Sequence, residues 1–193
     1  MTTTGKVTGR QWAGTSLFLG CVAFFMGMLL AEVLYPGYSV SHNYISDLGV
    51  GPEPSATLFN TSVFLFGLAG AVASFLLYRQ GTDRGFVLAL LVSSAGAMGV
   101  GVFHENIQPL HTIAAVVAFG GGAIVSMLSY RVAGRPLAYV GATLGAVSLT
   151  ALILMGAQTY LGLGAGGMER VVLYPAFLWI TGLGALLMLE RAP

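Results

Sequence analysis

Charged side chains are scarce in this chain of 193 residues, where eight Lys and Arg and seven Asp and Glu make up only 8% of the sequence. A typical soluble domain carries about 25% charged residues, so water is not the main solvent of this protein. The formal net charge is only +1, and no dense basic stretch occurs. Nucleic acid is therefore not expected as a partner, because its phosphates need a basic surface.

Cysteine is also nearly absent, since Cys21 is the only one and lies in an apolar run. An intrachain disulfide and a CxxC metal site are thereby excluded. The sequence also contains no GxSxG nucleophile elbow and no Walker-type phosphate loop. Any chemistry must therefore come from other residue types.

Long hydrophobic runs are what the chain does have, with 56% hydrophobic residues. About 20 apolar residues in a helix cross the hydrocarbon core of a bilayer, whereas barrel strands are shorter and alternate in polarity. We therefore predict an all-α polytopic membrane protein, a bundle of six transmembrane helices forming one domain over residues 1–193. The expected helices lie near 12–34, 58–78, 85–103, 113–130, 137–161 and 171–189.

The basic residues predict the orientation, because cytoplasmic loops carry an excess of Lys and Arg. Of the eight Lys and Arg residues, only Arg170 falls on one side of the predicted membrane, and the other seven fall on the opposite side. We expect a multi-pass cell-membrane protein with both termini cytoplasmic and with the loops at 35–57, 104–112 and 162–170 extracytoplasmic. The first apolar run is too long for a signal peptide and is read as a retained helix. The seven basic residues on the other side are Lys6, Arg10, Arg79, Arg84, Arg131, Arg135 and Arg191.

Glycine is abundant within the predicted helices, with 28 in the chain and a Gly141/Gly145 pair at GxxxG spacing. Small residues let helices approach closely in lipid, which predicts a tightly packed bundle. The same glycine-rich faces leave homo-oligomerisation open as a second interpretation.

Polar residues gather in the three predicted outer loops, together with all three histidines and five of the seven carboxylates. Ionisable groups at membrane depth are costly unless they are paired or face a polar cavity, so this cluster is the candidate functional site. Its main members are Glu32, Ser41, His42, Asn43, Ser46, Asp47, Asn60, His104, Glu105, His111, Glu169 and Arg170.

A metal site is one interpretation of the cluster. His42, His104 and His111, with Asp47, could hold zinc and activate a water molecule. In this version Asp47 serves as fourth ligand or base, and Glu105 or Glu169 moves protons. The alternative is structural: the same side chains cap helix ends and bond to one another.

A non-enzymatic pocket is a further interpretation, in which Ser41, Asn43, Asn60 and Arg170 bind a ligand. Arg170 either reaches an anionic headgroup or pairs internally with Glu105, Asp47 or Glu32. An unpaired buried arginine is costly, which favours the internal pair.

Several motifs resemble the domain-of-unknown-function 998 family: HNYISDLG in the first loop, Asn60, His111, and GGMERVVLYP before Trp179. The resemblance implies a six-helix prokaryotic membrane protein of a family without an assigned function. YISDLG also looks like the Frag/DRAM/Sfk proteins. More distantly, Ser41, Asp47 and the histidines are similar in type to the zinc site of the CREST lipid hydrolases. Those enzymes have seven helices and an HxxxH pair in the last helix, which is missing here.

The function expected from these features is binding of a lipid or small amphipathic ligand at the outer leaflet, with metal-dependent hydrolysis as its enzymatic version and with membrane lipids as partners. A non-catalytic scaffold or sensor is the alternative. A transporter is disfavoured, because the inner halves of the predicted helices offer mainly Gly, Ser, Thr and aliphatic residues rather than polar groups at the midplane.

Overall fold

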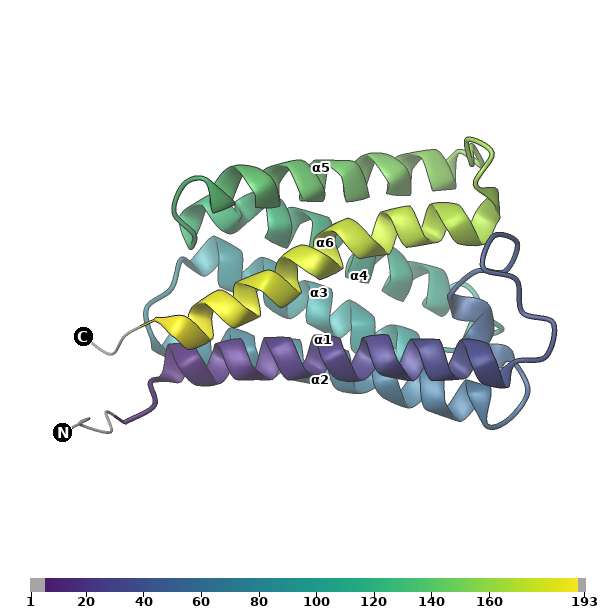
Figure 1. The fold of residues 1–193 in the computed structure, drawn as a ribbon, viewed down its shortest axis with the longest axis horizontal. Helices are drawn as coiled ribbons and strands as arrows, with labels where there is room; N and C mark the ends of the chain where they lie inside the picture. Colours follow the sequence, from purple (N-terminus) through teal and green to yellow (C-terminus); the bar gives the residue numbers. More distant parts are fainter. Residues whose placement is uncertain (1–5, 191–193) are drawn as a thin grey trace.

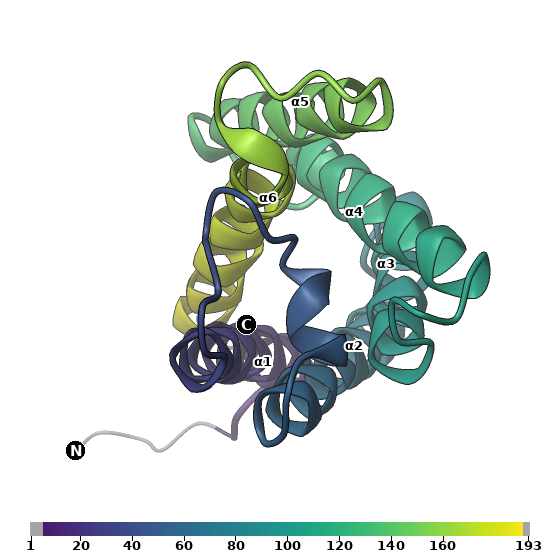
Figure 2. The same ribbon diagram turned by 90° about the vertical axis from the view of Figure 1, so that its right-hand side faces the viewer.

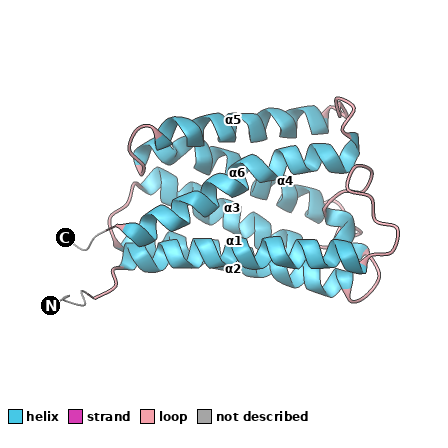
Figure 3. Ribbon diagram, viewed as in Figure 1, coloured by secondary structure: helices cyan, strands magenta, loops and turns pink. Residues whose placement is uncertain are grey.

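The computed structural model describes residues 6–190, and within them every regular element is helical (Figure 3). Six helices are long and apolar enough to cross a membrane, which confirms the predicted all-α, six-helix class. The elements are α1 (Gly9–Leu34), η1 (Ser46–Val50), α2 (Ser55–Arg79), α3 (Arg84–Val102), α4 (Leu110–Met127), η2 (Leu128–Arg131), α5 (Leu137–Gly156) and α6 (Gly164–Leu189).

The helices begin at local signals that the sequence carries. Thr8 and Gln11 form a capping box at α1, in which each side chain accepts the other residue's backbone N–H. Asp83 caps α3 by accepting the N–H of Phe86 at 2.9 Å. Proline cannot donate a backbone hydrogen bond and is tolerated at helix starts. Helices α2, α4 and α5 begin directly after Pro54, Pro109 and Pro136, respectively.

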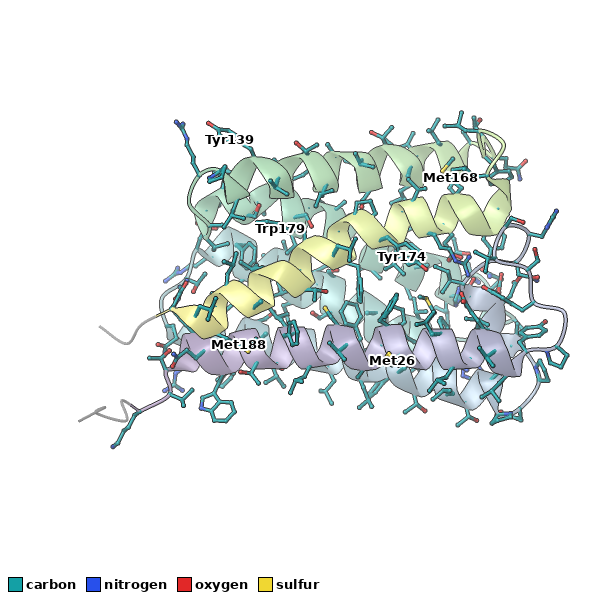
Figure 4. The ribbon with its side chains drawn as sticks, in the orientation of Figure 1. Met26, Tyr139, Met168, Tyr174, Trp179 and Met188 are labelled. Carbon is teal, nitrogen blue, oxygen red and sulfur yellow. The ribbon has the colours of Figure 1, made fainter. Side chains whose placement is uncertain are left out.

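The helices surround a common centre (Figures 1 and 2). Helices α1 to α4 pack in chain order, and α6 returns beside α1, so that α1, α2, α3, α4 and α6 form a ring. Helix α5 lies outside the ring, against α4 and α6. Along α6, Met168, Tyr174, Trp179 and Met188 follow one another from one end of the bundle to the other (Figure 4).

The predicted boundary between the last two helices is wrong. Helix α5 ends at Gly156 rather than near 161, and α6 begins at Gly164 rather than near 171, so the third loop is residues 157–163. The start of α6 lies against loop 35–54, where the N–H of Gly166 donates to the carbonyl of Ser41 at 3.0 Å. A Cβ at Gly166 would collide with the backbone of residues 40–43. Gly166 therefore marks a close contact between the start of α6 and loop 35–54.

The bundle has two chemically different ends. We call the end with both chain termini the terminal end, and the opposite end, formed by loops 35–54, 103–109 and 157–163, the polar end. Arg170 is the only described basic residue at the polar end, as the sequence predicts. Arg191 lies outside the described residues. That the terminal end faces the cytoplasm stays a prediction.

The Gly141/Gly145 pair packs inside the chain. A Cβ at Gly145 would lie 2.5 Å from the carbonyl oxygen of Ala123 in α4, and one at Gly141 would meet Ser129 and Trp179. The pair therefore supports the predicted tight bundle. Homo-oligomerisation stays a prediction that must rest on other faces.

Candidate functional site

Loop 35–54 folds back over the polar end, and η1 lies across the centre of the helix ring (Figure 2). The Tyr38 hydroxyl donates to the carbonyl of Tyr44 at 2.9 Å, which closes the loop on itself. The Asn60 amide of α2 donates to the carbonyl of Gly49 at 2.9 Å. The loop is therefore attached to the bundle at both α2 and α6 by hydrogen bonds to its backbone.

Arg170 is the main anchor of this loop. Its guanidinium forms an ion pair with Glu32 at 2.5 Å, and the two side chains are only 8% and 16% exposed. It also donates to the carbonyls of Val40 and Gly166, both at 2.9 Å, and to the Tyr38 hydroxyl at 3.0 Å. Four of its five N–H donors are thus engaged. The geometry supports the internal ion pair and leaves little of Arg170 for the predicted headgroup contact.

Glu169, the neighbour of Arg170 in α6, is 5% exposed. One carboxylate oxygen, Oε2, accepts the backbone N–H of Ile45 in loop 35–54. Among the described residues, no hydrogen bond is formed by the other oxygen, Oε1. Glu169 therefore ties the loop to α6 with one oxygen and keeps the second for another partner.

Asp47 organises the start of η1. Its Oδ2 accepts the Asn43 amide at 2.9 Å and the backbone N–H of Tyr44 at 3.0 Å. Glu105, from the loop between α3 and α4, stands beside Asp47, and its Oε2 is buried without a hydrogen-bond partner among the described residues. Burial, and next the Asp47 carboxyl, raise the pKa of Glu105 to about 7, while Ser46 acts in the opposite direction.

We expect the folded protein to lose stability between pH 4.5 and 7. The folded form binds a proton at Glu105 more tightly than the unfolded chain does, so the stabilisation is complete below the ordinary pKa of 4.5 and is lost as the pH rises through about 7. Because solvent screens this half-exposed carboxyl, the expected loss is about 1 kcal/mol. Thermal unfolding in detergent at pH 5 and pH 8 measures it.

Glu105→Gln mimics the protonated acid and is expected to remove most of this pH dependence, matching the wild type at pH 5 and exceeding it at pH 8. The exposed Glu53 at the same end provides the control, and Glu53→Gln should keep the wild-type slope. An unchanged slope in Glu105→Gln would show that the Asp47–Glu105 pair does not hold the proton.

The three histidines occupy separate environments. His42 is exposed at the tip of loop 35–54, where its Nδ1 lies 3.0 Å from Ser39 Oγ and 3.1 Å from Ser41 Oγ. His104 lines an outer hollow beside Glu53, and His111 is buried at the start of α4. Within residues 6–190, no group of three or more His, Cys, Asp or Glu side chains is placed to hold a metal ion. The structure does not assemble the predicted cluster of His42, His104, His111 and Asp47, so zinc binding stays a prediction without geometric support.

The predicted ligand-binding residues of the loops are mostly structural in this arrangement. Asn43 joins Ser39 to Asp47 through both ends of its amide. Asn60 holds Gly49, although its Oδ1 is buried without a partner among the described residues. Ser41 is exposed and lies apart from the buried groups. These side chains shape the loop that covers the bundle.

Two adjoining cavities lie beneath this loop, inside the helix ring. The outer one has a volume of about 70 Å³ and is lined at its polar end by Ser46, His111 and Glu169. The inner one has a volume of about 60 Å³. Both are largely apolar. Six residues line both cavities: Phe66, Ser93, Ala97, Ala118, Phe119 and Leu173.

Sequence reasoning missed the cavity walls. Phe66, Ala97 and Phe119 lie in apolar runs, where an inward-facing residue has the same character as one that faces lipid. The hydrophobic pattern therefore carries no signal for them. The polar members of the site were identifiable because a carboxylate or imidazole in such a run is unusual.

Comparison with known proteins gives one match. A family model described as "Protein of unknown function (DUF998)" matches residues 18–186. The match covers all six membrane-spanning helices in whole or in large part. No curated protein and no solved structure matches the chain.

Proposed function

The chain belongs to the DUF998 family, and from the geometry of its interior we propose that it is a membrane-embedded binding protein for a small amphipathic molecule. The ligand occupies the central cavities, with its polar group at Ser46, His111 and Glu169. The observation that carries this proposal is the pair of adjoining, largely apolar cavities whose titratable lining residues, His111 and Glu169, lie at only one end. Apolar walls with a few placed polar groups are typical of small-molecule sites.

The cavity volumes limit the size of the ligand. An apolar cavity of about 150 Å³ holds one benzene molecule. Cavities of about 70 and 60 Å³ that adjoin one another therefore suit a molecule of about six non-hydrogen atoms. This narrows the expected lipid or small amphipathic ligand to a small molecule, or to one small group of a larger one.

The arrangement favours binding over metal-dependent hydrolysis. The residues expected to hold zinc lie apart, whereas His111, Glu169 and Ser46 come together at the polar end of the outer cavity from α4, α6 and loop 35–54. A purely structural scaffold does not require the second oxygen of Glu169 to lie without a partner at the cavity wall. Such a site is suited to recognition.

Filling the cavity should abolish binding. Ala97 lines both cavities and is 5% exposed, so the Ala97→Leu side chain enters the space that the ligand would occupy. Titration calorimetry of the detergent-solubilised protein with cyclopentanol and cyclopentylamine should give saturable binding for the wild type and none for Ala97→Leu. Cyclopentyl probes have about the size that the cavities admit.

Ala95→Leu is the matched control, because Ala95 lies on the same helix but is exposed on the outside of the bundle. It should bind the probes as the wild type does. Equal binding by Ala97→Leu and the wild type would place the ligand elsewhere. If neither probe binds the wild type, that result would count against the proposed function.

A further inference from the structure

The polar end of the cavity presents hydrogen-bond acceptors. Glu169 lines the outer cavity, is 5% exposed and has one oxygen, Oε1, without a hydrogen bond to any described residue. An ionised carboxylate can only accept hydrogen bonds. Burying such a group without a partner is costly, so the free oxygen calls for a donor.

His111 adds a second acceptor. Its Nδ1 lies 2.7 Å from the carbonyl oxygen of Phe103. A carbonyl cannot donate, so this contact places a hydrogen on Nδ1, and in that tautomer Nε2 is an acceptor. His111 also lines the outer cavity. A ligand that fits both groups must donate hydrogen bonds, whereas a carboxylate or a ketone has only acceptors to offer.

The charges around the cavity make a cation the better donor. Glu32, Asp47, Glu105 and Glu169 gather at the polar end, and Arg170 is the only Arg or Lys among the described residues there. Arg170 is already paired with Glu32. The groups close to Glu169 are Glu105, Arg170 and Asp47, so that carboxyl groups are in excess of the one guanidinium. A bound cation would offset this excess.

The cavity walls suit an organic cation in particular. Phe24, Phe59, Phe66 and Phe119 line the outer cavity. The rings of Phe24 and Phe66 are stacked with centroids 5.2 Å apart, and Phe59 packs against Phe24 at 6.3 Å. Aromatic faces attract organic ammonium groups through the ring quadrupole, and this attraction strengthens when water is excluded. The same rings also favour an apolar body.

Resting on the proposed function, we propose that the ligand is a small organic ammonium, whose N–H groups are held by Glu169 and His111 and whose hydrocarbon part lies between the phenylalanine rings. The group is of the primary or secondary amine class, because a quaternary ammonium has no hydrogen to donate to Glu169 Oε1. Its source is either a free amine or the amine of a larger molecule whose remainder lies outside the cavity.

The test compares two probes that share one ring and differ in one group. Titration calorimetry at pH 7 with cyclopentylamine, which is then an ammonium, and with cyclopentanol uses the full-length protein in detergent. The Ala97→Leu protein supplies the blank for uptake by micelles. We expect the amine to bind the wild type about tenfold more tightly than the alcohol or better, since a charge-assisted hydrogen bond is about twice as strong as a neutral one.

Glu169→Gln removes the charge while its amide oxygen can still accept the Ile45 N–H. It should weaken amine binding about tenfold and change alcohol binding by less than about threefold. Glu53→Gln removes an exposed carboxylate at the same end and should leave both affinities unchanged. If Glu169→Gln does not fold, the wild-type comparison of the two probes decides by itself.

The outcomes separate this inference from the function on which it rests. Equal or weaker binding of the amine than of the alcohol by the wild type would overturn the ammonium assignment and leave the cavity as a site for neutral molecules. A preference for the amine that survives in Glu169→Gln would overturn the role of Glu169. No binding of either probe would remove the proposed function itself.

Discussion

Arg170→Ala is expected to lower the stability of the protein by about 3 to 5 kcal/mol, the usual effect of removing one partner of a buried ion pair. The change leaves the largely buried carboxylate of Glu32 without its counter-ion. It also removes the hydrogen bond to the Val40 carbonyl, which attaches loop 35–54 to α6. For a chain of this length the melting temperature should fall by about 10 °C. Thermal unfolding in detergent, followed by circular dichroism, measures the shift.

The ion pair between Arg10 and Glu190 at the terminal end is the natural control, because its side chains are 28% and 39% exposed. Arg10→Ala should cost less than about 1 kcal/mol, since solvent screens an exposed pair. The double variant Arg170→Met/Glu32→Leu should recover part of the loss, because an apolar pair leaves no uncompensated charge. Equal losses for Arg170→Ala and Arg10→Ala would contradict the anchoring role of Arg170.

Gly67→Leu is expected to destabilise the bundle by about 3 kcal/mol or more, because overpacking cannot be relieved where the neighbour is backbone. Gly67 lies in α2 where it meets α3. A Cβ at this position would lie 2.6 Å from both the Ser94 carbonyl oxygen and the Met98 nitrogen. A larger side chain must push the two helices apart. Thermal unfolding in detergent should show a fall of about 6 °C or more.

Gly182→Leu distinguishes this packing effect from the general effect of replacing glycine in a helix. Gly182 lies in α6, is exposed, and has no heavy atom within 4 Å of the position of a Cβ. Its replacement should change stability by less than about 0.5 kcal/mol, as is usual for surface positions. Similar losses at Gly67 and Gly182 would show that helix contact at Gly67 is not what requires glycine.

The sequence predicted the fold class well because membrane insertion depends on length and hydrophobicity, which are local properties. Four of the six helices both begin and end within about three residues of their predicted bounds, while the α5–α6 connection was misplaced. The error has a physical source. Gly164, Gly166 and Gly167 resemble a flexible turn in isolation, but contact with loop 35–54 makes Gly166 the residue that fits in the first turns of α6.

The site was predicted only in part. Clustering of Glu32, Asp47, Glu105 and Glu169 at one end followed from their places in the loops and helix ends. Their partners did not follow, because pairing depends on how α1, α6 and loop 35–54 are placed relative to one another. The three histidines show the limit most clearly: they lie at the same end of the bundle but in separate environments.

By itself the sequence determined that this chain has six membrane-spanning helices and that its costly polar groups lie at one end. Both follow from the order of residues along the chain, which fixes where the hydrophobic runs and the charges fall. Only the tertiary structure decided that Arg170 pairs with Glu32, that Glu169 meets both Ile45 and the cavity, and that the cavity has aromatic walls. Those features depend on which helix faces meet, since a lipid-facing and a cavity-facing phenylalanine have the same sequence character.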